Sequence, residues 1–282
     1  MMKNLLPIAI FLMMVSVGTS FRLSDMLANL RVMGRQTWLR LLLVVFILPP
    51  LLALVLARFL HLSLAETGGL FLIGVAPGAP LLTRNVAKRG FDAQLAATYQ
   101  VLVALITPLM IPLLVVSAAK LYDQNVWIPP AVLIEQVAEK QFLPLLIGIA
   151  LMYLTPALSI KLRPLLNMFG NIVLYCFMAI LLFKMRSQLK EITPWVVVAT
   201  LLLVVGSIAL VHLLVKAGGL RKRTLAICNA NRHVGLALLL SGHYLHSKNS
   251  LPTVACYAII APVVMGIYSK YPRPQLVETS LT

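Results

Sequence analysis

Acidic residues, cysteines and charged residues in general are scarce in this sequence. Asp and Glu together number 8 in 282 residues, Lys and Arg number 24, and all four make up 11% of the chain. A soluble domain carries about 25% charged residues, so this composition argues against a soluble protein. The three cysteines, Cys176, Cys228 and Cys256, all fall in apolar segments and indicate no disulfide framework.

Motifs of familiar enzymes are missing as well. The sequence contains no phosphate-binding loop, no His-Glu-x-x-His and no paired carboxylates. Cys228 and His233 are five positions apart, which places them on different helical faces and argues against a nucleophile and base pair. A metal set of these two with His243 and His246 would need an exposed loop to reach a residue most of a span away. We therefore expect no enzyme, no resident metal and no cofactor.

Long apolar runs dominate the chain instead. Hydrophobic residues make up 60% of it, and one membrane-spanning helix needs about 20 of them. We therefore predict an all-α, polytopic membrane protein in which residues 1–282 form a single domain with about nine transmembrane helices. Pro49 and Pro50 predict a kink in the second span. The expected spans cover residues 4–21, 41–60, 66–81, 93–119, 131–157, 165–183, 194–215, 224–241 and 251–269.

The first apolar run follows Lys3 and has the shape of a signal peptide, with a basic start, an apolar centre and small residues near its end. Residues 4–21 are numerous enough to span a membrane, and a basic loop that is typical of a cytoplasmic anchor follows them. We therefore expect a retained helix, with cleavage as the alternative.

The third apolar segment ends abruptly. Residues 77–80, Pro-Gly-Ala-Pro, stop the helix, and LLTRNVAKRG follows at once with the polar residues Thr83 and Arg84. This pattern predicts a discontinuous helix. Arg84 has two interpretations, because it can face a substrate or anchor the segment at the cytoplasmic surface beside Lys88 and Arg89.

The segment 224–241 carries polar residues inside an apolar stretch. They are Asn229, Asn231, Arg232 and His233. No nearby acid neutralises Arg232, and a charge at the centre of a transmembrane helix costs roughly 2.5 to 3.5 kcal/mol on insertion scales. Such a charge by default marks a substrate or ion path. The alternative for Arg232 is a structural role in which it pairs with carbonyl groups at helix ends.

Each half of the chain, residues 1–125 and 131–275, has one interrupted segment next to its end. Transporters built from inverted repeats show such a pair, with the binding site where the two segments meet. The layout therefore predicts inverted repeats whose two discontinuous helices cross. At such a crossing, His233 either couples transport to protons or bonds across a helix interface. Asn229 and Asn231 are expected to bond both the freed backbone groups and the substrate.

Lys and Arg are distributed unevenly over the expected connections. Fifteen fall in 22–40, 84–92, 158–164, 216–223 and the tail after 269, and eight fall on the opposite side. By the positive-inside rule the first group is cytoplasmic, which puts the N-terminus outside and the C-terminus in the cytoplasm of a bacterial-type inner membrane. Topology thus accounts for the formal net charge of +16, and we expect membrane lipid rather than nucleic acid as a partner.

Over nearly its whole length the chain resembles the bile acid:sodium symporter family and its bacterial and plastid relatives. The likeness is carried in order by FLMMVSVGTSFRLSDM, GVAPGAPLLTRNVAKRGFDA and RTLAICNANRHVGLALLLS. Its most specific parts are Pro77-Gly78 and Gly235-Leu236-Ala237. The resemblance implies a panel and a core domain, with two discontinuous helices crossing in the core. The family's first helix has no counterpart here, which fits nine spans and an outside N-terminus.

The departures from the family's sodium-driven members concern the oxygen ligands of the cation. Positions that the resemblance assigns to these ligands hold Val45, Leu82, Thr83, Ala96, Gln100, Cys228, Arg232 and His233. A hard cation wants several oxygen ligands, so the resemblance implies that the two sodium sites are not kept. Arg232, always charged and suited to bidentate carboxylate contact, then acts as a fixed cation in place of sodium or binds an anionic substrate directly.

These patterns together predict a secondary transporter that moves a small organic anion by alternating access. A proton-coupled or uncoupled carrier and a non-transporting membrane ligand sensor are the alternatives, and a homodimer is left open. The substrate or ion is expected to meet residues at both breaks and on the helix after the first one: Pro77, Gly78, Thr83, Arg84, Gln100, Cys228, Asn229, Asn231, Arg232 and His233.

Overall fold

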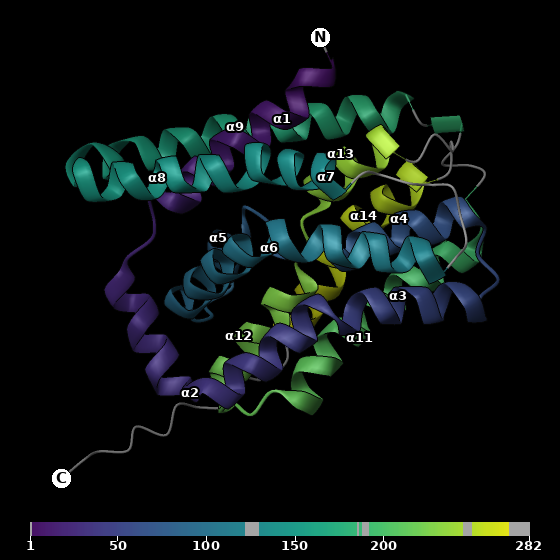
Figure 1. Ribbon diagram of the computed structural model, residues 1–282, viewed down its shortest axis with the longest axis horizontal. Coiled ribbons are helices and arrows are strands. Elements are labelled where there is room, and N and C mark those ends of the chain that lie inside the picture. The colour runs from purple at the N-terminus through teal and green to yellow at the C-terminus, as the bar shows by residue number, and fades with distance from the viewer. Residues whose placement is uncertain (1, 122–129, 185, 188–191, 245–249, 271–282) are drawn as a thin grey trace.

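The computed structural model of the protein describes residues 2–121, 130–184, 186–187, 192–244 and 250–270. This part of the chain is helical, and no strand occurs in it (Figure 1). The helices of the first half are α1 (Met2–Gly18), α2 (Leu23–Phe46), α3 (Leu48–Phe59), α4 (Leu64–Val75), α5 (Leu82–Lys88) and α6 (Ala93–Leu121). Those of the second half are α7 (Pro130–Val137), the π-helical turn η1 (Ala138–Phe142), α8 (Leu143–Leu154), α9 (Pro156–Lys184), α11 (Pro194–Leu214), α12 (Gly219–Ala230), α13 (Val234–Tyr244) and α14 (Ser250–Lys270).

Several helices have the length and composition of membrane spans. Within the described residues, 6 candidate spans run over Leu23–Phe59, Ala93–Ala118, Leu133–Leu154, Pro156–Lys184, Pro194–Leu214 and Ser250–Lys270. The apolar helices Leu5–Gly18 and Leu64–Val75 are shorter. The architecture is therefore that of a polytopic membrane protein, while the number nine and the inverted repeats stay predictions.

Helices α1, α8 and α9 lie side by side and form one layer along the top of Figure 1. We call these three helices the α1/α8/α9 layer, and we call α2 to α6 with α11 to α14 the main bundle. Helices α1 and α8 touch through glycines. A Cβ atom on Gly18 would lie 2.3 Å from the Leu145 carbonyl oxygen, and one on Gly148 would lie 2.1 Å from the Val15 carbonyl oxygen. Small residues let membrane helices approach this closely.

The expected kink at Pro49 and Pro50 is confirmed. Helix α2 ends at Phe46 and α3 begins at Leu48 with both prolines in its first turn. Gly74 of α4 fits against the bend, since a Cβ there would lie 2.9 Å from the Pro50 Cα. The bend at the two prolines therefore packs closely against the C-terminal end of α4.

The expected connection at residues 158–164 was wrong. These residues belong to α9, which begins at Pro156. The expected connection contains Lys161 and Arg163, but Lys and Arg are good helix formers and do not end a helix. The chain instead turns at Thr155 and Pro156, where a proline occupies the first helical position.

The contact between Gly18 and Gly148 predicts a strong cost for added volume. We expect Gly148→Ala to lower stability by about 1–3 kcal/mol or more, because backbone atoms on α1 must move apart. The measurement is the melting temperature of the purified protein in detergent. Gly218→Ala is the matched control, because a Cβ on Gly218 meets no atom within 4 Å. Equal melting of the two variants would contradict the close contact.

Candidate functional site

The two interrupted segments are broken and cross each other. The first break separates α4 from α5 over residues 76–81, and the second separates α12 from α13 over residues 231–233. The backbone N–H of Ala79 donates to the Asn231 carbonyl at 3.2 Å, and the N–H of His233 donates to the Ala76 carbonyl at 2.8 Å. Each break therefore provides hydrogen-bond partners for free backbone groups of the other, as non-helical backbone at membrane depth requires.

The first break turns through Pro77 and Gly78, both buried. Gly78 has φ of +76°, and a Cβ there would lie 3.1 Å from Cγ1 of Val103 on α6. Only glycine adopts this backbone conformation without strain. The proline and the glycine are therefore needed for the shape of the break.

Gln100 on α6 fills the inside of the first break. Its Nε2 donates to the carbonyls of Ala79 and Pro80 at 2.9 and 3.0 Å. Its Oε1 accepts from the Thr83 hydroxyl at 2.6 Å. The carbonyls freed by the break are thus bound by an amide N–H, and Thr83 is held at the start of α5.

Arg232, at the second break, binds carbonyls at the ends of two other helices with a charged guanidinium. Its Nη1 donates to the Val45 and Gly74 carbonyls at 2.9 and 3.3 Å, and its Nη2 donates to Oδ1 of Asn229 at 2.9 Å. Val45 and Gly74 lie in the last turns of α2 and α4, where helix carbonyls carry partial negative charge. The Arg232 side chain is 2% exposed, and no carboxylate of the described residues lies within ion-pair distance of it.

Neighbouring polar groups hold the second break in place. Nδ2 of Asn229 donates to the Ser207 carbonyl at 2.8 Å, and the Tyr257 hydroxyl donates to the Ala230 carbonyl at 2.6 Å. Nδ1 of His233 accepts from the N–H of Leu236 at 3.0 Å and so caps α13. A ring nitrogen that accepts carries no proton, so His233 is neutral here with its proton on Nε2.

Four buried polar atoms near the crossing have no partner among the described residues. They are the Tyr99 hydroxyl, Nδ2 of Asn231, Nε of Arg232 and Nε2 of His233. Each of them carries a hydrogen that it can donate. Unpaired donors of this kind attract water or an anionic group that carries acceptor oxygens.

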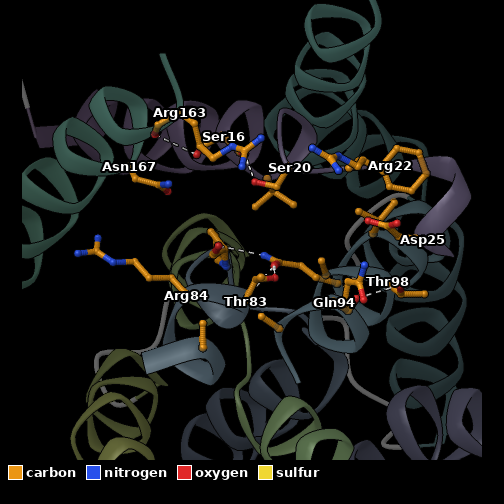
Figure 2. A pocket seen from close by; sticks show the side chains of 18 residues that line it. Ser16, Ser20, Arg22, Asp25, Thr83, Arg84, Gln94, Thr98, Arg163 and Asn167 are labelled. Carbon is orange, nitrogen blue, oxygen red and sulfur yellow. Dashed lines mark hydrogen bonds between the residues drawn. The ribbon is translucent and has the colours of Figure 1, made fainter. Parts of the chain in front are cut away.

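A cavity of about 410 Å³ opens between the α1/α8/α9 layer and the main bundle (Figure 2). Figure 2 shows Ser16, Ser20 and Arg163 on one side of it and Thr83 and Arg84 on the other. The remaining lining is partly apolar and partly polar: Val17, Phe21, Arg22, Asp25, Pro80, Ala87, Ala93, Gln94, Ala97, Thr98, Gln100, Val101 and Asn167. Pro80, Thr83 and Gln100 belong to the first break or bind it, so the cavity adjoins the crossing.

A second cavity of about 750 Å³ shares Arg84, Arg163 and Asn167 with the first. We call the two together the basic crevice. Among the residues that the structure describes, its charged lining consists of Arg22, Arg84, Lys88, Arg163 and one carboxylate, Asp25. Four cations against one anion give the crevice a positive potential, which suits an anionic ligand.

The structure divides the residues proposed from the sequence into two groups. Thr83, Arg84 and Gln100 line the basic crevice. The others lie buried at the crossing and are absent from its lining: Pro77, Gly78, Cys228, Asn229, Asn231, Arg232 and His233. The Arg232 contacts are those of the structural alternative, a guanidinium that binds helix-end carbonyls.

Sequence reasoning missed the opposite wall of the crevice. Ser16 on α1 and Arg163 and Asn167 on α9 line it. The spacing of Arg163 and Asn167, four positions apart, places them on one helical face. This signal was hidden because 158–164 had been expected to form a connection.

The profile of the Sodium Bile acid symporter family matches residues 7–192, well over half of the chain. The matched region contains the first break and most of the α1/α8/α9 layer but ends before the second break. A comparison with curated proteins finds no match.

The carbonyl contacts of Arg232 predict a structural penalty for its removal. In Arg232→Met the Val45 and Gly74 carbonyls lose their donor, which costs about 1–3 kcal/mol for each buried group left unpaired. We expect a clearly lower melting temperature without any ligand. Arg221→Met, at an exposed position near the start of α12, should melt like the parent protein. If both variants melt alike, the guanidinium does not hold the second break.

Proposed function

This chain belongs to the Sodium Bile acid symporter family, and we propose from that premise that it is a secondary transporter of a small organic anion. The family match and the apolar helices support a membrane transporter in general. The observation that carries the narrower proposal is the basic crevice, because it adjoins the first of the two crossed helix breaks. Transporters bind substrate where such discontinuous helices meet.

The crevice favours an anion that has an apolar part. Arg22, Arg84 and Arg163 supply guanidinium groups that bind carboxylate or sulfate oxygens. Val17, Phe21 and Val101 line the same cavity and offer apolar contact. A small inorganic ion would leave this apolar surface unused, so we favour an organic anion.

Alternating access follows from the two layers on either side of the crevice. We propose that the α1/α8/α9 layer is the panel, that the main bundle is the core, and that the core rocks against the panel around the bound anion. Basic residues next to α1, in α5 and near the start of α9 line the crevice: Arg22, Arg84, Lys88 and Arg163. By the positive-inside rule it then opens to the cytoplasm, with the N-terminus outside.

We further propose that transport does not depend on sodium at the two breaks. Arg232 binds the Val45 and Gly74 carbonyls, and Gln100 binds those of Ala79 and Pro80. These oxygens are the kind that a hard cation would need as ligands. Since N–H groups of the protein already occupy them, a guanidinium and an amide stand in for removable cations.

Sodium independence can be measured by ligand-induced stabilisation. We expect taurocholate, an amphipathic anion, to raise the melting temperature equally in sodium chloride and in potassium chloride, because stabilisation follows affinity. If stabilisation by taurocholate requires sodium, a sodium site has been built from other residues. If neither taurocholate nor cholate stabilises the protein in either salt, the proposed substrate class is wrong.

The role of Arg163 can be separated from general charge effects on α9. We expect Arg163→Gln to weaken taurocholate binding roughly tenfold or more, since a hydrogen bond to a charged group contributes about 1.5–3 kcal/mol. Lys161→Gln is the matched control, because Lys161 is exposed on the same helix outside the crevice. The measurement is counterflow of labelled taurocholate in proteoliposomes, where a ligand sensor would bind without exchange. Equal counterflow in both variants would exclude Arg163 from the site.

A further inference from the structure

We propose that this protein is an anion exchanger, in which the basic crevice closes and reopens across the membrane when an anion occupies it and stays open when it is empty. The proposal rests on the transport function proposed above and adds the mode of transport. It follows from arginines on both walls of the crevice and from the fixed donors at the two helix breaks.

Arginines from both layers line the same space. Arg84 projects from α5 of the main bundle, and Arg163 projects from α9 of the opposite layer (Figure 2). Both residues line both cavities of the basic crevice. Any motion that brings the two layers together on this side therefore brings two guanidinium groups closer to each other.

Neighbouring groups of the protein do not neutralise the repulsion between the guanidinium groups of Arg84 and Arg163. Asp25 is the one carboxylate among the described lining residues, and it lies three positions after Arg22, which lines the same cavity. Arg163 donates through Nη2 to the Thr19 carbonyl, and its Nε has no partner in the described structure. Arg84 makes no hydrogen bond or ion pair with the described residues. An anion between Arg84 and Arg163 would supply the missing negative charge.

Release of a bound sodium ion cannot return the empty site to its starting state in this protein. The donors that bind the carbonyls at the breaks, the Arg232 guanidinium and the Gln100 amide, are covalently part of the chain. Arg232 donates to the Val45 carbonyl and Gln100 to that of Ala79, so these carbonyls are satisfied by the chain itself in the empty carrier. The anion is then the component whose arrival changes the charge of the site. An empty carrier meets the full repulsion on closing, so the return step requires a second anion.

The first test measures the opening of the crevice without any substrate. Spin labels on Leu154→Cys and Leu213→Cys report the distance between the two layers, since both positions are highly exposed and lie outside the crevice lining. Cys176 and Cys256 are replaced by serine. The protein is placed in phosphatidylcholine nanodiscs, so that no anionic lipid can enter the crevice.

At low salt, we expect most molecules of the parent protein to show a long distance between the two spin labels. In Arg84→Gln, we expect several-fold more molecules to show a short distance between them. Salt should act in the same direction, because the Debye length falls from about 30 Å at 0.01 M to about 3 Å at 1 M. Arg84→Lys, which keeps the charge, and Arg221→Gln, which removes a distant one, should match the parent. Arg163→Gln should repeat the Arg84→Gln result from the other wall.

Identical distance distributions in the parent protein, Arg84→Gln and Arg163→Gln at both salt concentrations would overturn the proposal.

The second test measures efflux of preloaded taurocholate from proteoliposomes. We expect at least tenfold faster efflux into medium that contains unlabelled taurocholate than into anion-free medium, and a smaller ratio in Arg84→Gln. Equal efflux into both media would overturn exchange while leaving a carrier. Absence of flux in both media would instead overturn the transport function.

Discussion

A broken helix inside a membrane leaves backbone groups that water cannot reach, and the centre of this protein is arranged around satisfying them. The two breaks do this partly for each other, through the bonds from Ala79 to Asn231 and from His233 to Ala76. Side chains complete the pairing, with the amide of Gln100 at one break. Because these bonds join segments more than a hundred residues apart, the crossing fixes how the two halves of the main bundle meet.

The charged side chain of Arg232 also binds backbone carbonyls that would otherwise lack a partner. A buried cation without a carboxylate partner is costly, but helix C-termini offer carbonyls with partial negative charge. Arg232 uses two such ends and the Asn229 amide. The guanidinium is thereby bound to the backbone, and Arg232 lies outside the lining of the basic crevice. In the proposed function, structure and binding are thus divided between different arginines.

The sequence alone predicted those features that depend on local chemistry. A proline followed by a glycine favours the end of a helix, as at Pro77 and Gly78, and Arg232 stands out because few charges lie in apolar segments. The opposite wall of the crevice was not predictable in this way, since Arg163 belongs to it through the packing of α9 against α1. Arg163 was counted within an expected connection, although a basic residue does not prevent a helix from beginning before it. The carbonyl partners of Arg232 also come from distant helices that no local pattern joins.

The attachment of Arg232 to the chain has an electrical consequence. A sodium ion that is bound on one side and released on the other carries its charge through the membrane field, at about 2.3 kcal/mol per 100 mV. In the proposed exchange cycle, a guanidinium held at the crossing travels with the protein in one direction and returns with it, so its contribution over a full cycle is zero. The membrane voltage would then act on the cargo alone, and a swap of two equally charged anions would be driven by their concentrations.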